Sequence, residues 1–267
     1  FLNKFIDMLI NSLYDYYVDE NLFINEKNSV IEELNSIINN NDYKFETFVE
    51  KALFKNHTRS YTQEERLTNV KKTKTNFYKT NAPAFDPISV TNHKNLWHRG
   101  FPIQILDKRK DAKKQIKIIK ADIQADFWNG DPDIDAICRM EHHPICKFKD
   151  KYFPLSSNKV SPFNSQNTFI SKKVLPHYFL FPHIGRMDDI WASYYVLSKG
   201  FKVVYNKASV FQKRNEHDLT KDMLKEFIGY ENNLNLVKDL KKNINNINSF
   251  IPERSRLAFL RYQTHFK

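Results

Sequence analysis

The chain has 267 residues, 41% hydrophobic and 14% aromatic, which is enough for a core of its own. Its net charge of +11 favours polyanions, phosphorylated small molecules or anionic surfaces as partners, but the basic residues are dispersed, which disfavours a nucleic-acid arm. Two cysteines exclude a disulfide framework, and the sequence has neither a signal peptide nor a run of 18 apolar residues, so we expect a cytoplasmic protein without a membrane span.

The first part of the chain alternates predicted helices with a strand. Helical spacing of apolar residues predicts a helix over 2–13, and a strand over 16–18 runs into an acidic cluster that begins at Asp19. A capping-box pattern predicts a second helix over 29–38. Residues 55–80 are polar and basic, which indicates an exposed loop.

The middle of the chain holds an aromatic turn and an acidic segment. Residues 96–103 combine Trp97, Arg99 and a Gly-Phe-Pro turn. Residues 116–127 alternate roughly between apolar and polar, which predicts a strand ending near Trp128. The acidic segment 129–135 follows directly.

Two adjacent carboxylates, Asp188 and Asp189, stand at a predicted loop-to-helix junction. Residues 192–198 are good helix material, Gly200 suits the position after a helix end, and 201–205 reads as a strand. The helix dipole stabilises acidic residues in the first helical turn, so the pair could simply cap the helix. The alternative is that the two carboxylates have a chemical role.

Asp218 or Thr220 begins a long predicted helix with an apolar side that ends at Leu240. We therefore expect one domain over residues 1–240 and a basic C-terminal extension over 241–267.

Alternating helices and short strands predict an α/β fold. Ligands bind outside the carboxyl ends of strands in such sheets, so Asp19, Asp131 and Asp188 are expected to converge on one crevice. A phosphorylated ligand there requires Mn²⁺ or Mg²⁺ to bridge the carboxylates. With 5 glycines and no phosphate-binding glycine loop, Walker-type nucleotidases and typical dinucleotide enzymes are disfavoured.

A second cluster of potential metal ligands comprises Cys138, His142, His143 and Cys146. The four residues lie closer together than the two separated ligand pairs of most zinc sites. The alternative is that Cys138 is buried on a strand and that the histidines begin a turn.

Four segments in this order resemble the STELLO-type glycosyltransferases, relatives of the plant reversibly glycosylated polypeptides, which are UDP-arabinopyranose mutases. They are Trp97–Pro102, Gly130–Arg139, Gly185–Trp191 and Gln212–Asp218, and the resemblance spans roughly residues 13–235. It implies a GT-A-like mixed sheet flanked by helices, a nucleotide-sugar donor, usually a UDP-sugar, and a divalent metal. The family's early run of aspartates has its nearest match in Asp19-Glu20-Asn21, and only one helix precedes it. Either the chain lacks part of the N-terminal nucleotide-binding half or this match is misaligned, so we expect a GT-A-like glycosyltransferase or its catalytic fragment.

The resemblance also implies roles for individual residues. Asp188 and Asp189 are expected to face the acceptor or the sugar, one of them as general base, and Arg99 is expected near the anomeric carbon as the counterpart of the glycosylated arginine. Asp19 and His217 are the expected metal ligands. The remaining residues expected to bind the nucleotide sugar are Trp97, Asp131, Asp133, Arg139 and Arg186.

Three alternatives to transfer onto an unknown acceptor stay open. The chain could be a nucleotide-sugar mutase, a degenerate assembly domain or a non-catalytic module that binds polyanions. A pure polyanion binder has no need for three acidic clusters at strand ends, which disfavours nucleic acid as the partner.

Overall fold

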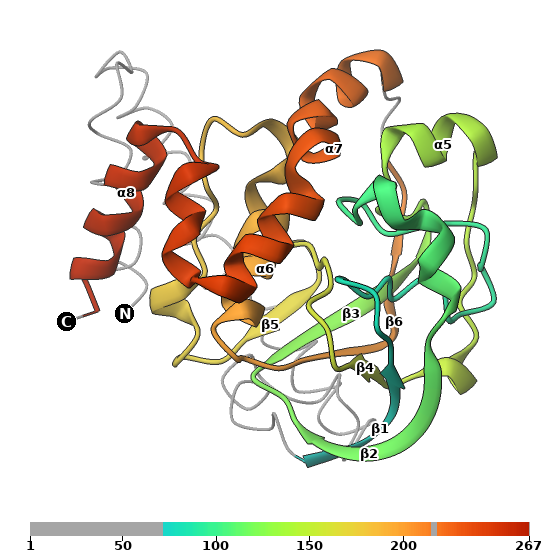
Figure 1. Ribbon diagram of the computed structural model, residues 1–267. Coiled ribbons are helices and arrows are strands. Elements are labelled where there is room, and N and C mark those ends of the chain that lie inside the picture. The colour runs from blue at the N-terminus through green and yellow to red at the C-terminus, as the bar shows by residue number, and fades with distance from the viewer. Residues whose placement is uncertain (1–71, 215–217, 267) are drawn as a thin grey trace, which may run out of the picture. The chain divides into compact units, whose positions relative to one another are not determined.

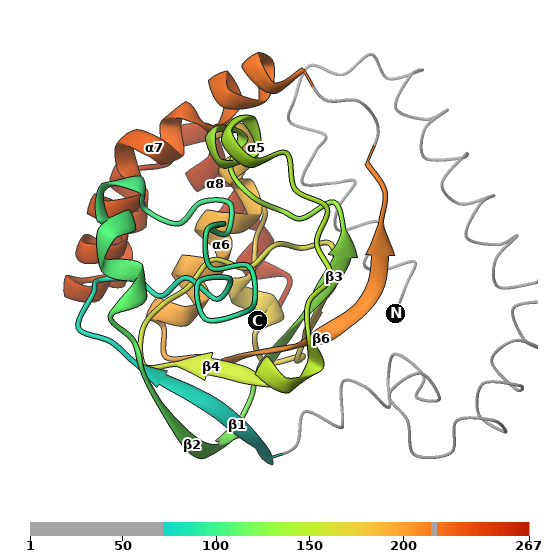
Figure 2. The same ribbon diagram turned by 90° about the vertical axis from the view of Figure 1, so that its right-hand side faces the viewer.

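The computed structural model describes residues 72–214 and 218–266, and nearly all of them belong to one compact unit, Val70–Phe259. Within this part of the chain, six strands form one mixed sheet in the order β2-β1-β4-β6-β3-β5 (Figures 1 and 2). The strands are β1 (Lys72–Lys79), β2 (Lys113–Lys120), β3 (Ile123–Gly130), β4 (Leu155–Ser157), β5 (Thr168–Ile170) and β6 (Val203–Gln212).

The sheet contains two parallel pairs that point in opposite directions. β1 runs parallel to β4, and β3 runs parallel to β6, whereas β4 and β6 are antiparallel neighbours. The carboxyl ends of the β3/β6 pair and of the β1/β4 pair therefore lie at opposite edges of the sheet. Each edge is a position at which an α/β sheet can place a ligand.

The described residues also form four α-helices: α5 (Ala136–His142), α6 (Asp188–Ser198), α7 (Leu219–Lys242) and α8 (Glu253–Thr264). Figures 1 and 2 show α6 and α7 on the same side of the sheet. Short 3-10 turns, η2 to η6 in chain order, connect these elements. They are Ile103–Lys110, Asp150–Tyr152, Leu175–His177, Gly185–Met187 and Ile244–Ser249. None of the helices in the described ranges combines the length and the apolar character that crossing a bilayer requires.

Helix α6 is the centre of the core, because its residues 189–196 are all buried. The Trp191 indole donates to Asn233 Oδ1 at 2.7 Å, and Asn233 Nδ2 donates to the Gly100 carbonyl at 2.8 Å. The Tyr194 hydroxyl donates to the same carbonyl at 2.9 Å. Gly100 has φ +80°, and a Cβ there would lie 2.4 Å from Ile190 Cγ2, so the backbone approaches α6 more closely than any other residue permits.

The structure confirms the α/β class and several predicted elements. The helix over 192–198 is the main part of α6, the strand over 201–205 is the beginning of β6, and Asp218 caps α7 by accepting from Lys221 N. Other predictions were wrong. The strand over 116–127 is two strands, β2 and β3, and β1 occupies the end of the expected loop 55–80.

The elements predicted over 2–13, 16–18 and 29–38 lie outside the described residues. At the other end, the compact unit continues past residue 240 as far as Phe259. The Phe259 ring packs 5.5 Å from Phe179 and 5.2 Å from Phe181. The boundary expected at residue 240 lies next to the end of α7 at Lys242, and it stays a prediction.

Candidate functional site

A network of buried ion pairs lies at the carboxyl ends of β3 and β6, where the loops after both strands meet the beginning of α6. We call it the arginine network. Its members in the described part of the chain are Arg99, Arg139, Arg186 and Arg214 with Asp131, Asp133, Asp189, Asp222 and Glu226.

Arg99 holds the centre of the network. Its Nε donates to Asp133 Oδ1 at 2.9 Å, its Nη2 donates to Asp189 Oδ1 at 3.0 Å, and its Nη1 contacts the Arg186 carbonyl oxygen. Burial alone would lower the pKa of Arg99, but Asp133 and Asp189 raise it well above its ordinary value. Arg99 is therefore a buried cation held by two carboxylates, and the glycosylated role that the resemblance implies stays a prediction.

Asp133 is held from three directions. Besides Arg99, it accepts from Arg214 Nη2 at 3.2 Å and from Asn164 Nδ2 at 2.8 Å. Burial would raise its pKa, yet the nearby Arg99 and Arg214 guanidiniums lower it below the usual 3.8. Asp133 is therefore a fixed anion inside the network.

Asp131 and Arg186 extend the network in two directions. Asp131 contacts Arg139 directly and lies 3.9 Å from Arg214 Nε. Arg186 Nη1 lies 3.0 Å from Asp222 Oδ1, and its Nε lies 2.9 Å from Glu226 Oε1 without hydrogen-bond geometry. The contacts of Asp131 tie the loop after β3 to α5 and to the residues after β6, and those of Arg186 tie the turn before α6 to α7.

Trp97 enters the site through Asp135. Its indole Nε1 donates to Asp135 Oδ2 at 2.6 Å, and Gly100 N donates to Asp135 Oδ1 at 2.9 Å. Burial and the charge of Glu226 raise the pKa of Asp135 well above 3.8, which favours its neutral form. The cation over the Trp97 ring is Arg109, at 5.4 Å, and not Arg99.

The two adjacent aspartates have different surroundings. Asp189 is buried, pairs with Arg99 and accepts from Ser165 N at 3.0 Å. Asp188 is half-buried, and no described side chain forms an ion pair or a hydrogen bond with its carboxylate. Burial and the charge of Asp189 raise the pKa of Asp188 above 3.8, while the backbone N–H groups of Asp189 and Asp188 oppose that rise. Within the described residues, Asp188 is thus the carboxylate of the pair without an ion-pair partner.

Tyr178 adds a polar group that the sequence did not indicate. Its ring stacks on Phe163 at 5.7 Å, and its buried hydroxyl has no hydrogen-bond partner among the described residues. Burial together with the charges of Asp189 and Asp188 raises the pKa of Tyr178 well above 10.0, so it remains a neutral donor beside the two aspartates. A buried hydroxyl without a partner costs about 1–3 kcal/mol, which a ligand oxygen would offset.

The predicted site residues within the described ranges therefore come together. Arg99, Asp131, Asp133, Arg139, Arg186 and Asp189 belong to the arginine network, Trp97 joins it through Asp135, and Asp188 borders it. Sequence reasoning assigned no role to Tyr178, Asn164, Ser165 or Glu226. Arg214 lies in the resembling segment Gln212–Asp218, but no role was predicted for it. Its basic side chain was the only indication in the sequence that it could bind an anion.

The residues described here do not fit a metal ion. Asp19 and His217 lie outside the described residues, and no group of three His, Cys, Asp or Glu residues in the described part has the geometry of a metal site. The carboxylates of Asp131, Asp133 and Asp189 already face arginines. The divalent metal therefore stays a prediction.

The cysteine and histidine cluster is dispersed in the structure. Cys138 is fully buried in α5, not on a strand as expected, and Cys146 pairs with Gly130 through backbone hydrogen bonds. His143 adopts a left-handed conformation at the end of α5, and the His142 ring meets Trp97 edge-on at 6.3 Å. Burial raises the pKa of both thiols to about 12, so they are protonated in this structure.

No protein-family model matches the chain, and no curated protein matches it significantly.

Proposed function

We propose that the chain is a GT-A-like glycosyltransferase that takes a sugar from a nucleotide sugar, and that the surface around Asp188 binds the hydroxyl-bearing acceptor. One observation carries the proposal. Within the described residues, the half-buried Asp188 carboxylate forms no ion pair, and its charge acts on the buried Tyr178 hydroxyl, which has no hydrogen-bond partner there; both groups border the ion-pair network. These are the groups that a general base and its hydrogen-bonding neighbour require.

In the proposed step, Asp188 accepts the proton of an acceptor hydroxyl while that oxygen forms a bond to the anomeric carbon. The bond from this carbon to the diphosphate oxygen breaks, and the nucleoside diphosphate leaves with the electron pair. The raised pKa of Asp188 makes it a stronger base than an ordinary aspartate. Tyr178 donates a hydrogen bond to an oxygen of the acceptor or of the transferred sugar.

The balance of charge favours a sugar over a bare polyphosphate at this position. In the described part of the site, the carboxylates of the arginine network already outnumber its four guanidiniums before Asp188 is added. Surplus carboxylates repel phosphate but accept hydrogen bonds from hydroxyl groups. The donor diphosphate thus requires a cation, and the resemblance implies Mn²⁺ or Mg²⁺ with Asp19 and His217 as its ligands.

The test measures UDP release from a panel of UDP-sugars, with Mn²⁺ and a mixture of acceptor sugars, by the wild type and by Asp188→Asn. We expect kcat to fall about 10²- to 10⁴-fold in Asp188→Asn, the usual contribution of a general base, while the melting temperature changes little. Asp150→Asn is the matched control, because that carboxylate is exposed and lies in η3.

Equal rates in Asp188→Asn and the wild type would remove Asp188 from the mechanism. An absence of UDP release with every donor, together with tight and steeply salt-dependent binding to RNA, would instead favour the polyanion-binding module. Interconversion of UDP-arabinopyranose and its furanose form without an acceptor would favour the mutase.

A further inference from the structure

An open pocket of about 500 Å³ lies away from the arginine network, between the sheet and the C-terminal end of α6. We call it the lysine pocket. Its lining residues are Phe77, Lys117–Ile119, Ser156–Val160, Leu197 and Gly200–Val203. The pocket adjoins the start of β6, whereas the arginine network adjoins its end. A ten-residue strand spans about 30 Å, so the two sites are well separated.

The topology places this pocket where a second ligand site is expected. Ser156, Ser157 and the loop that follows them are at the carboxyl end of β4, which is parallel to β1. The β1/β4 pair therefore has a crevice at its carboxyl ends, as the β3/β6 pair has at the opposite edge.

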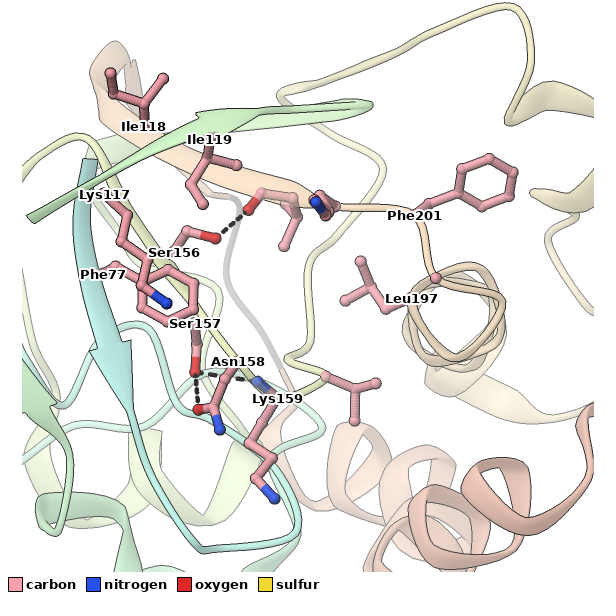
Figure 3. A pocket seen from close by; sticks show the side chains of 14 residues that line it. Phe77, Lys117, Ile118, Ile119, Ser156, Ser157, Asn158, Lys159, Leu197 and Phe201 are labelled. Carbon is pink, nitrogen blue, oxygen red and sulfur yellow. Dashed lines mark hydrogen bonds between the residues drawn. The ribbon is translucent and has the colours of Figure 1, made fainter. Parts of the chain in front are cut away.

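One part of the pocket is apolar. Phe77 and Ile119 are buried members of one hydrophobic cluster of the sheet, and Leu197 projects from α6 toward them (Figure 3). The polar groups beside them are already satisfied. Ser156 Oγ donates to the Val203 carbonyl at 2.7 Å, and Ser157 Oγ donates to the Tyr78 carbonyl at 2.9 Å. An apolar body can cover this wall without leaving those hydroxyls unpaired.

The charges of the lining are all positive. Lys117, Lys159 and Lys202 contribute ammonium groups, and no Asp or Glu of the described chain belongs to the lining. Lys117 Nζ lies 4.3 Å from the centre of the Phe77 ring, which places one cation directly beside the apolar wall (Figure 3). None of the three ammonium groups forms an ion pair within the described part of the chain, so an anion would meet them unneutralised.

We propose that the lysine pocket binds a small amphipathic anion, with an apolar body against Phe77, Ile119 and Leu197 and one carboxylate, sulfonate or phosphate group among the lysines. The volume lies within the roughly 300–1,000 Å³ range of small-molecule pockets. This site is independent of the proposed transferase, because it shares no residue with the arginine network.

The experiment compares two fluorescent probes of nearly the same shape. 1-Anilinonaphthalene-8-sulfonate carries one negative charge, and N-phenyl-1-naphthylamine carries none. The test variant is the triple substitution Lys117→Gln, Lys159→Gln and Lys202→Gln. The control variant removes three other exposed lysines through Lys94→Gln, Lys238→Gln and Lys241→Gln, so both variants lose the same net charge.

We expect the test variant to bind the sulfonate at least about ten-fold more weakly than the wild type, and the uncharged probe within about two-fold. The control variant should bind both probes like the wild type. Equal sulfonate affinity in the wild type and the test variant, or an equal loss in the control variant, would overturn the proposal.

A second measurement locates the probe in the wild type. Lysine acetylation followed by mass spectrometry should show that the sulfonate protects Lys117, Lys159 and Lys202 but leaves Lys238 and Lys241 reactive. Uniform protection, or protection confined to other lysines, would contradict the assignment even if the affinities change as expected.

Discussion

The arginine network and the lysine pocket hold their charges in opposite ways. In the network, guanidiniums pair with carboxylates, and the single side chain of Arg99 contacts Asp133, Asp189 and the Arg186 carbonyl. In the pocket, the charged groups are exposed or half-buried lysines without ion pairs in the described part of the chain. Paired charges fix the positions of the network members and leave Asp188 without an ion pair at their border in the described residues, whereas unpaired cations leave a surface ready for an anion.

The largest difference between the two regions is expected in the stability that is lost when one cation is removed from each. Arg99→Met leaves the buried Asp133 and Asp189 without their partner, and we expect the free energy of unfolding to fall by about 3–5 kcal/mol. Lys117→Met removes an exposed ammonium group and should cost less than about 1 kcal/mol. Urea denaturation of both variants measures the difference. A loss below about 1 kcal/mol in Arg99→Met would mean that the network does not hold the fold together.

A buried carboxylate near the network gives this region its own pH dependence. Asp86 accepts from Ile88 N at 3.1 Å and from His98 N at 3.2 Å, and burial raises its pKa from 3.8 to about 6 against the opposing effects of His98 N–H and Arg109. The folded protein therefore binds this proton more tightly than the unfolded chain. The contribution of Asp86 to stability falls as the pH rises from about 4 to about 6.

We expect Asp86→Asn to remove that decline, which is on the order of 2–3 kcal/mol. The measurement is urea denaturation of the wild type and the variant at pH 4 and pH 7. The triple lysine variant of the pocket is the control, because it should keep the decline of the wild type. An Asp86→Asn protein with the same pH dependence as the wild type would show that Asp86 titrates normally.

Substitution of two glycines tests how tightly the arginine network and the lysine pocket are packed. Gly185, next to Arg186, has φ +62°, and Gly200, in the lining of the lysine pocket, has φ +96°, so alanine is strained at either position by about 1–2 kcal/mol. A Cβ at Gly185 would lie 2.1 Å from the Lys225 carbonyl oxygen, but a Cβ at Gly200 meets nothing within 4 Å.

Gly185→Ala should therefore destabilise the protein by about 1–3 kcal/mol more than Gly200→Ala. Thermal unfolding of the two variants checks this order. Equal melting temperatures would indicate that the backbone of α7 shifts easily away from residue 185.

Local patterns predicted much of the fold around these sites. The helical spacing before Gly200 and the cap at Asp218 depend on neighbouring residues, and both gave the correct elements. The break between β2 and β3 was missed because its cause is distant in the sequence. Asp122 accepts from Lys202 N at 2.9 Å, a contact between residues eighty positions apart.

The site was predictable as a set of residues but not as an arrangement. Acidic segments after strands indicated a shared crevice, and the structure brings Asp131, Asp133 and Asp189 into one network. The different surroundings of Asp188 and Asp189 were not predictable, because they depend on which of the two pairs with Arg99. Arg99 lies in a loop that is distant in the sequence. The orphaned hydroxyl of Tyr178 likewise results from tertiary packing alone.

The proposal that Asp188 is the general base, while Asp189 pairs with Arg99, is tested most directly by a carbon-13 NMR titration of the Asp188 side-chain carboxyl. Because burial and the neighbouring charge of Asp189 disfavour its anion, we expect a titration midpoint clearly above the roughly 3.9 of an unperturbed aspartate. Assignment relies on the loss of the signal in Asp188→Asn. A midpoint at or below about 3.9 would show that Asp188 is an ordinary ionised helix-capping residue and would contradict the proposed general base.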